Sequence, residues 1–211
     1  MDITSLGTPF GLAFASGLNA YLPLLACAIS ARWLHLVRLN PNFTFITSNW
    51  FITALALLTI LDFFADKIPL IEHIWNAIHT VVRPFAGAIV AVAASGQAIP
   101  EMHITSFSSL YGSGIVLAAL NAIPLTGMVL LVILLIGAGL AALSHTTKST
   151  TRLLSTIVSA GFLNIGLSVI EDVLVIVFVL LSLFASAIMF ILLVLILLIL
   201  LPQFIRGRFF T

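Results

Sequence analysis

The longest apolar stretch of this chain runs from Phe162 to Leu201 and is interrupted by one charged pair, Glu171 and Asp172. A helix needs about 20 apolar residues to cross the hydrocarbon core of a bilayer. This stretch is therefore long enough for two crossings, with a tight turn that we place near residues 182–186. Only 7% of the chain is charged and 62% is hydrophobic, whereas about a quarter of a soluble domain is charged. The sequence predicts an all-α, polytopic membrane protein.

Apolar runs of this length predict about six transmembrane helices in a single domain, residues 1–211. We expect them at about 10–31, 49–66, 82–98, 121–144, 162–182 and 185–204. Six crossings place both termini on one side, together with most of the Lys and Arg residues. The positive-inside rule then predicts a multi-pass protein of the cell inner membrane with cytoplasmic termini.

Two connections, 70–82 and 146–160, have the 3.6-residue periodicity of amphipathic helices. In the first, Trp75 belongs to the apolar face, and His79 and Arg83 belong to the polar face. Both segments are expected to lie at the membrane interface or to re-enter the bilayer. Each follows a predicted span and a lysine, so the pattern indicates an internal repeat of two hairpins; chance similarity is the alternative.

Ionisable residues gather in the first hairpin. Asp62 and Asp66 are one helical turn apart, and in a low dielectric two such carboxylates favour a shared proton or cation. Arg83 begins a predicted span, where its charge opposes the helix dipole, so it needs a carboxylate or a lipid phosphate as partner. His79 lies one turn before it. The alternative for Asp66 and Lys67 is a solvated ion pair at the helix end.

The second hairpin carries a basic stripe, formed by His145, Lys148 and Arg152 at steps of three and four. It faces either a binding site or lipid headgroups. Glu171 and Asp172 fall near the centre of the fifth span. Acids inside a membrane are costly, so they indicate either a functional site or a structural pair with Lys or Arg. Two polar residues approach them at helical spacing, Asn164 and Ser168.

Prolines interrupt two of the predicted spans. Asn19 and Pro23 lie within the first, and Pro84 lies at the start of the third. Proline removes a backbone hydrogen bond, and Asn can supply a replacement partner. The sequence leaves open whether these residues break a helix around a polar cavity or only kink it.

The motifs of the common enzyme classes are absent. The sequence contains no HExxH, phosphate-binding loop, GxSxG or dinucleotide pattern. We therefore predict no metal, cofactor or catalytic residues. No Lys/Arg cluster points to nucleic acid.

Five sequence elements in order resemble one bacterial family of small multi-pass inner-membrane proteins, catalogued as a domain of unknown function. They are GLNAYLPLL, ADKIP, HTVVRPFAGA, SHTTKSTTR and a late ED pair. The resemblance covers about residues 11 to 180 and implies a polytopic membrane protein without assigning an activity. The chain departs from the family pattern in a longer stretch between Pro100 and Leu120, and in STIVSAGFLN, which lacks the expected proline.

These observations predict a small transporter or channel whose acids and bases form one charge-balanced intramembrane site, with proton or cation coupling. Glu171 and Asp62 are its expected titrating groups, and an unknown small solute or ion and membrane lipids are its expected partners. The first alternative is a lipid-binding or lipid-organising protein that uses its basic amphipathic helices. The second is an intramembrane enzyme on a phosphorylated lipid, with His79 or His145 as base. Homo-oligomerisation stays open. The predicted site is Asp62, Asp66, Lys67, His79, Arg83, His145, Lys148, Arg152, Asn164, Ser168, Glu171 and Asp172, with helix breaks at Asn19, Pro23 and Pro84.

Overall fold

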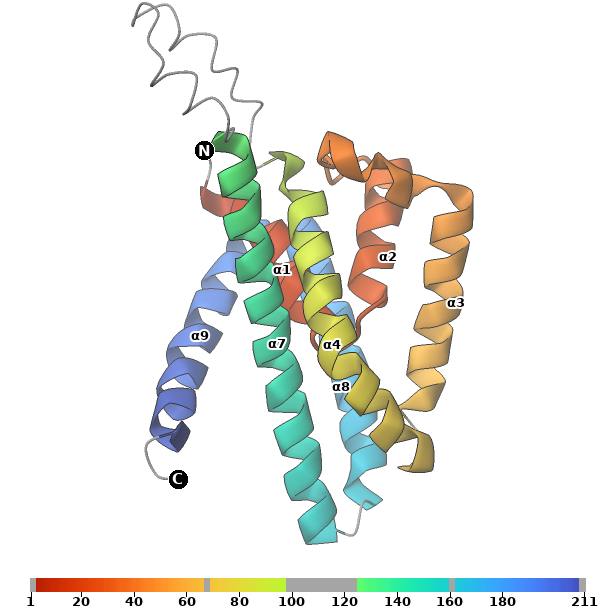
Figure 1. Cartoon of the computed structure of the whole chain (residues 1–211), viewed down its shortest axis with the longest axis vertical. Helices are drawn as coiled ribbons and strands as arrows, with labels where there is room; N and C mark the ends of the chain where they lie inside the picture. Colours follow the sequence, from red (N-terminus) through yellow and green to blue (C-terminus); the bar gives the residue numbers. More distant parts are fainter. Residues whose placement is uncertain (1–2, 67–68, 98–124, 160–161, 209–211) are drawn as a thin grey trace, which may run out of the picture.

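The computed structural model describes residues 3–66, 69–97, 125–159 and 162–208, and the regular structure within these ranges is helical (Figure 1). The predicted all-α fold is confirmed. Lys67 and the stretch from Pro100 to Leu120 lie outside the described residues.

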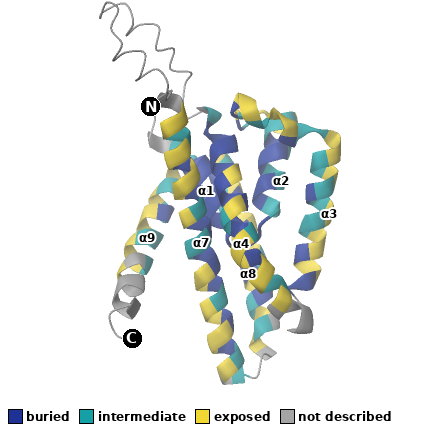
Figure 2. Ribbon diagram, viewed as in Figure 1, coloured by how far each residue is buried: buried dark blue, intermediate teal, exposed yellow. Residues whose placement is uncertain are grey.

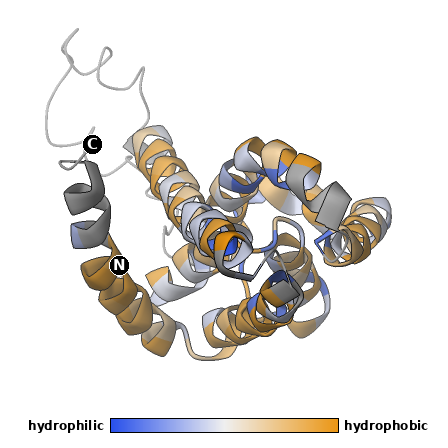
Figure 3. Cartoon of the chain, turned by 90° about the horizontal axis from the view of Figure 1, so that it is seen from below, coloured by the Kyte–Doolittle hydropathy of each residue, from blue (hydrophilic) through white to orange (hydrophobic). Residues whose placement is uncertain are grey.

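Three described segments are long and apolar enough to cross a membrane: Ile74–Gly96, Gly127–Ile157 and Gly166–Phe184. A fourth arises if Pro41–Thr47 and Asn49–Ala65, which meet at 67°, count as one bent span, and Leu22–Leu34 and Ser186–Leu200 are shorter apolar helices. Large apolar side chains such as Leu57, Val177 and Leu198 are exposed on the outer helices, whose surfaces are mostly hydrophobic in Figure 3. Such a surface suits lipid, and the chain is a membrane protein.

The first predicted span, 10–31, is not one continuous helix. Helix α1 (Gly7–Ser16) ends in mid-molecule, and α2 (Leu22–Ile29) returns toward the end from which α1 entered (Figure 1). Asn19 Oδ1 accepts hydrogen bonds from the backbone N–H groups of Tyr21, at 3.1 Å, and Leu22, at 2.9 Å. Asn19 thereby satisfies the N–H groups of the N-cap residue Tyr21 and of the first helical residue Leu22, and Pro23 occupies the first turn, where its missing N–H costs nothing. The two helices form a re-entrant hairpin.

This hairpin changes the topology. A π-helical turn, η2 (Ser30–Leu34), and a 3₁₀ segment, η3 (Pro41–Thr47), follow α2. They lie at the same end as the C-terminus of α4, since Asn40 N donates to Ala93 O at 2.9 Å. Because α1 and α2 together do not cross the bundle, the ends of the described chain lie at opposite ends of it in Figure 1. The sequence had placed them on one side.

Two long helices, α4 and α7, each combine a predicted span with a predicted amphipathic helix. Helix α3 (Asn49–Ala65) leads into α4 (Pro69–Ala93), which continues through Pro84 to a short 3₁₀ turn, η4 (Ala94–Gln97). Helix α7 (Leu125–Ser159) runs unbroken from the fourth predicted span through 146–160. No Gly or Pro interrupts SHTTKSTTRLL, and its threonine hydroxyls bond back to carbonyls of the same helix, for example Thr147 to Leu143 O. The helical backbone of α7 therefore continues through the change from an apolar to a polar sequence.

The last two helices are α8 (Phe162–Phe184) and α9 (Ser186–Arg208), and Ala185 separates them. This break lies within the turn predicted near residues 182–186. Thr8 Oγ1 donates to Ser182 O at 2.7 Å, which ties the start of α1 to the end of α8.

Small residues pack α1, α4 and α7 closely at the end of the bundle that holds the re-entrant hairpin. All ten residues of α1 are buried, and the helix is enclosed by its neighbours in Figure 2. A Cβ on Gly87 of α4 would lie 2.4 Å from Ala141 Cβ and 2.9 Å from the Gly137 carbonyl of α7. Glycine permits this approach, as in other membrane helix pairs.

Candidate functional site

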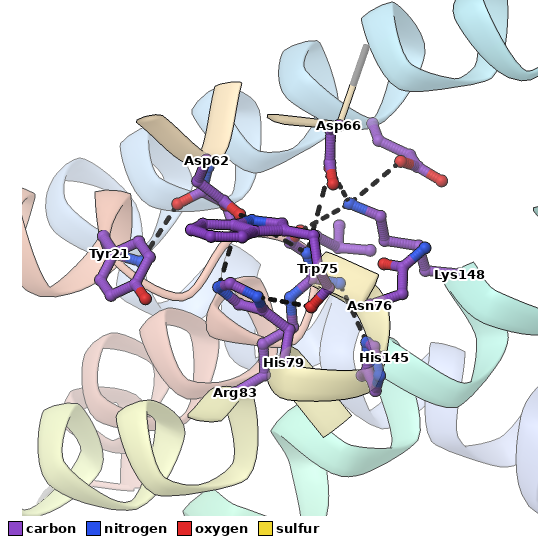
Figure 4. A network of polar contacts seen from close by, with 12 residues as sticks. Tyr21, Asp62, Asp66, Trp75, Asn76, His79, Arg83, His145 and Lys148 are labelled. Atoms are coloured by element: carbon purple, nitrogen blue, oxygen red, sulfur yellow. Dashed lines mark hydrogen bonds and ion pairs between the residues drawn. The ribbon is translucent and has the colours of Figure 1, made fainter. Parts of the chain in front are cut away.

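Four helices and the tip of the re-entrant hairpin enclose a group of ionisable side chains (Figure 4). We call it the buried cluster: Asp62, Asp66, His79, Arg83, His145, Lys148, Arg152 and Glu171. Every member is at most 9% exposed, and Arg83 and His79 are fully buried. The first two come from α3 and its C-cap, the next two from α4, the next three from α7 and the last from α8.

An ion-pair network joins the hairpin of α3 and α4 to the hairpin of α7 and α8. Lys148 Nζ lies 2.6 Å from Asp66 Oδ2 and 3.2 Å from Glu171 Oε2. Arg152 donates from Nε to Glu171 Oε1 at 3.2 Å and from Nη2 to Glu171 Oε2, and Nη2 also lies 3.4 Å from Asp66 Oδ2. Two cations of α7 thus hold one carboxylate from each neighbouring helix.

The re-entrant tip supplies backbone acceptors to the same cations. Arg83 Nη1 donates to Gly17 O at 3.4 Å, and Lys148 Nζ donates to Leu18 O at 3.0 Å. The C-terminal carbonyls of a helix carry partial negative charge, so the end of α1 is a favourable place for both cations. Gly17 is required here, because a Cβ would lie 1.8 Å from Ser144 Oγ.

Asp62 is 1% exposed and forms a second group with aromatic residues. Trp75 Nε1 donates to Asp62 Oδ1 at 2.6 Å, and His79 Nε2 lies 3.5 Å from the same oxygen. Arg83 Nη2 lies 3.9 Å from Asp62 Oδ1 and 3.9 Å from Asp66 Oδ2, so it stands between the two carboxylates. Tyr21, from the re-entrant tip, lies beside Asp62 in Figure 4.

Hydrogen bonds fix the tautomer of each histidine. His79 Nδ1 lies 2.9 Å from Trp75 O, and since a carbonyl only accepts, Nδ1 carries the proton. His145 is the reverse case. Its Nδ1 accepts from Arg83 Nη1 at 2.9 Å, and its Nε2 lies 3.3 Å from Thr80 Oγ1, whose own proton goes to Asn76 O. His145 is therefore neutral with its proton on Nε2.

The charges of the buried cluster balance. Three carboxylates (Asp62, Asp66, Glu171) face three basic side chains (Arg83, Lys148, Arg152), and a neutral His145 adds no charge. An isolated charge at mid-bilayer costs about 2.5–3.5 kcal/mol on insertion scales, and mutual pairing offsets much of that cost. The balanced set explains how the bundle tolerates so many ionisable groups.

Several polar atoms within the cluster have no hydrogen-bond partner among the described residues. The acceptors are Asp62 Oδ2 and Asp66 Oδ1, and the donors are Arg83 Nε and Nη2. Nε and Nη2 form one edge of the guanidinium, which matches two acceptor atoms side by side. Buried polar groups are normally satisfied. The arrangement can therefore bind water or a small polar solute that both donates and accepts hydrogen bonds.

A polar strip along the α7–α8 contact extends from Glu171 toward the turn between these helices. Asn164 Nδ2 donates to Thr156 Oγ1 at 2.9 Å, while Asn164 Oδ1, Ser168 Oγ and Ser155 Oγ are buried without partners among the described residues. We call Ser155, Ser159, Asn164 and Ser168 the polar strip. It adjoins the cluster at the end of the molecule opposite to the re-entrant hairpin.

The predicted amphipathic helices have the reverse of the expected orientation. His79, Lys148 and Arg152 point inward and are buried, whereas Ile74, Leu153 and Ile157 are 65%, 63% and 74% exposed. An interfacial helix would present its charges to headgroups. Here the apolar face suits lipid, because the polar faces of α4 and α7 satisfy one another inside the bundle.

Most of the predicted site residues that the structure describes come together, whereas Asp172 and Pro84 are placed differently. Asp172 is half-buried, and as the neighbour of Glu171 on α8 it points about 100° away around the helix. Lys67 lies outside the described residues. Pro84 lies inside α4 and does not break it. The repeat is also inexact, because acids precede bases in α3–α4 and bases precede the acid in α7–α8.

Sequence reasoning missed Trp75 and the carbonyls of Gly17 and Leu18. Trp75 was placed on the apolar face, although Trp75, His79 and Arg83 step by four and so share one face. An indole also carries a polar N–H, which makes tryptophan suitable for the edge of a polar site. Backbone carbonyls leave no residue-type signal. Within the described part of the chain, no group of three or more His, Cys, Asp or Glu side chains could hold a metal ion.

Comparison with known proteins gives one match. A family model described as a domain of unknown function (DUF4126) matches residues 6–205. Searches of curated proteins and of solved structures give no match.

Proposed function

Since this chain belongs to the family described as a domain of unknown function (DUF4126), we propose from its own geometry that it is a small membrane transporter or channel. The proposed solute is a small polar molecule or ion, and the proposed binding site is the buried cluster. The family description assigns no activity, and the proposed function rests on the side chains of the buried cluster.

The observation that carries the proposal is the combination of charge balance with unsatisfied atoms. A purely structural ion-pair network is stable only when its hydrogen bonds are complete, since leaving a buried polar group unsatisfied costs about 1–3 kcal/mol. In this cluster, Arg83 presents an open guanidinium edge, and both Asp62 and Asp66 retain an unpartnered oxygen among the described residues. These atoms gain partners when a polar solute binds.

The re-entrant hairpin supports the same function. Non-helical backbone at membrane depth is tolerated where it is buried in protein or lines a polar cavity. Here the tip supplies Gly17 O and Leu18 O to Arg83 and Lys148. Broken helices serve this purpose in transporters, where half-helix ends and free carbonyls contribute to the binding site.

The two ends of the bundle differ in a way that favours a carrier over an open pore. On one side of the cluster, α1, α4 and α7 are closely packed at Gly87, Gly137 and Ala13. On the other side, the polar strip leads toward the α7–α8 turn. A solute in this conformation would have access from one end only, and transport would require the packed end to open.

The two alternatives receive less support. A headgroup-binding role needs exposed bases, but Lys148 and Arg152 are 4% and 3% exposed and are held in ion pairs. An enzymatic role needs a histidine with a free lone pair that a substrate can reach. His145 Nδ1 already accepts from Arg83, and His79 Nε2 is fully buried and lies 3.5 Å from Asp62 Oδ1.

Reconstitution into liposomes tests the proposal. A pH-sensitive dye inside the vesicles is followed under gradients of pH, sodium and potassium, and across a panel of small polar solutes. We expect flux with the unmodified protein, flux at the level of empty vesicles with Asp66→Asn, and normal flux with Thr146→Val, which alters an exposed hydroxyl of the same helix bundle. Absence of flux under every gradient, with correctly folded protein, would overturn the proposal.

A further inference from the structure

Asp62 and His79 face each other in a way that is unfavourable unless a proton lies between them. His79 Nδ1 is committed to Trp75 O, so in the neutral ring Nε2 has a lone pair. That lone pair lies 3.5 Å from Asp62 Oδ1, and neither Nε2 nor Asp62 Oδ2 has a hydrogen-bond partner among the described residues. Both side chains are at most 1% exposed, so bulk water does not screen the repulsion.

We propose that Asp62 and His79 form a binding site for one exchangeable proton, which acts as the coupling ion of the transporter. The coupling role of the proton rests on the proposed transport function, whereas the binding of the proton by Asp62 and His79 does not. Protonation of His79 Nε2 converts the repulsive contact into an imidazolium–carboxylate pair. The proton is bound and released without any bond change elsewhere.

Two aromatic rings lie against His79. Its ring is 4.7 Å from that of Trp75 and 5.6 Å, in a T-shaped contact, from that of Tyr21. Trp75 also donates to Asp62, so one residue positions both members of the pair.

The net charge of the buried cluster disfavours proton binding. Without it, the three carboxylates and three cations of the cluster sum to zero, and with it the set is positive by one charge. The repulsion between Asp62 and His79 thus favours binding of the proton, whereas the surrounding cations favour its release. The charged and titratable groups around the pair are Tyr21 at the re-entrant tip, Asp66 on α3, Arg83 on α4, His145, Lys148 and Arg152 on α7, and Glu171 on α8.

The other carboxylates and the second histidine are unsuited to this role. Glu171 is held by Arg152 and Lys148, and Asp66 by Lys148 at 2.6 Å. His145 accepts from Arg83, and protonation at Nδ1 would break that bond. Of the two groups expected from the sequence to titrate, Glu171 and Asp62, the inference retains Asp62 and pairs it with His79.

Nitrogen NMR of histidine-labelled protein in lipid nanodiscs tests the site directly. We expect one histidine, assigned by its loss in His79→Gln, to change from the Nδ1–H tautomer to imidazolium as the pH falls across the range in which the protein stays folded. His145, assigned in the same way, should keep its Nε2–H tautomer throughout and serves as the internal control. A His79 signal that stays neutral over this range would overturn the inference.

Two variants should shift the titration in opposite directions. Asp62→Asn removes the carboxylate, so the midpoint should fall by about one pH unit or more, a tenfold loss of proton affinity. Trp75→Phe keeps an aromatic side chain beside His79 but removes the indole N–H that donates to Asp62 Oδ1, so the midpoint of the His79 titration should rise. Equal shifts in both variants, or none, would indicate a purely structural pair.

The proton site and the transport function can fail separately. A titrating His79 in a protein without flux would retain the site and overturn the function. Flux that is independent of pH, with His79 neutral, would retain the function and overturn the site. We expect both to hold, with proton entry into vesicles abolished in Asp62→Asn.

Discussion

Arg152 and Glu171 join α7 to α8 through two parallel hydrogen bonds, Nε to Oε1 and Nη2 to Oε2. Both side chains are nearly buried, and Lys148 reaches the same carboxylate at 3.2 Å. A bidentate pair of this kind fixes orientation as well as charge. It aligns the second hairpin and so determines where Lys148 meets Asp66 of the first.

Glu171→Gln should therefore destabilise the protein. The change leaves Arg152 and Lys148 with one carboxylate between them, and removing one partner of a buried ion pair typically costs about 3–5 kcal/mol. Thermal unfolding in detergent, followed by circular dichroism, measures this loss. The exchanged pair Arg152→Glu with Glu171→Arg should recover part of the stability, and a single Glu171→Gln variant as stable as the unmodified protein would contradict the ion-pair role.

Asn19→Ala should loosen the re-entrant tip. The side chain of Asn19 accepts from the N–H groups of Tyr21 and Leu22, and loss of an N-terminal cap costs about 1 kcal/mol. Asn19→Asp keeps the acceptor oxygen and should retain more of the stability. The difference between the two variants in thermal midpoint is the measurement, and equal midpoints would mean that the cap contributes nothing.

Gly87→Ala should disturb the packed end of the bundle. The new Cβ would lie 2.4 Å from Ala141 Cβ and 2.9 Å from a backbone carbonyl, and overpacking of this kind costs about 1–3 kcal/mol. Gly139→Ala is the matched control, because no atom lies within 4 Å of its added Cβ. We expect Gly139→Ala to unfold at an unchanged or slightly higher temperature, and similar losses in both variants would contradict close packing at Gly87.

The sequence was informative about which residues form the site and less so about how they pair. Asp66, Arg83, Lys148 and Glu171 could be selected because an ionisable group in an apolar chain needs a partner or a function. Spacing by four placed Asp62 with Asp66 on one helix face. The pairing across hairpins depends on tertiary packing, which no local pattern encodes.

The sequence predicted correctly the features of the fold that depend on the length of an apolar run. It did not predict where a helix continues or reverses. The apolar run after Phe162 divides near the expected turn, because its length exceeds one bilayer crossing. Residues 146–160 continue α7, since polarity changes there without a helix-breaking residue. The reversal at Gly17–Tyr21 depends on contacts with Arg83 and Ser144, which lie far away in the sequence.

Cysteine labelling tests the predicted one-sided access to the buried cluster. In a Cys27→Ala background, which removes the buried native thiol, single cysteines replace Ser159, Ser155 and Ser168 along the polar strip. The proposed access along this strip predicts that a charged thiol reagent modifies Ser159→Cys fastest and Ser168→Cys slowest, since Ser168 is fully buried in this conformation and is reached only when the strip opens.

Ser144→Cys provides the matched control for the labelling experiment. Ser144 is 1% exposed and donates to Phe14 O at 2.6 Å on the closely packed side of the cluster. It should stay unmodified, since the reagent would have to pass between α1, α4 and α7. Comparable labelling of Ser144→Cys and Ser168→Cys would contradict one-sided access, and in that case a continuous pore would explain transport better than a carrier that opens each end in turn.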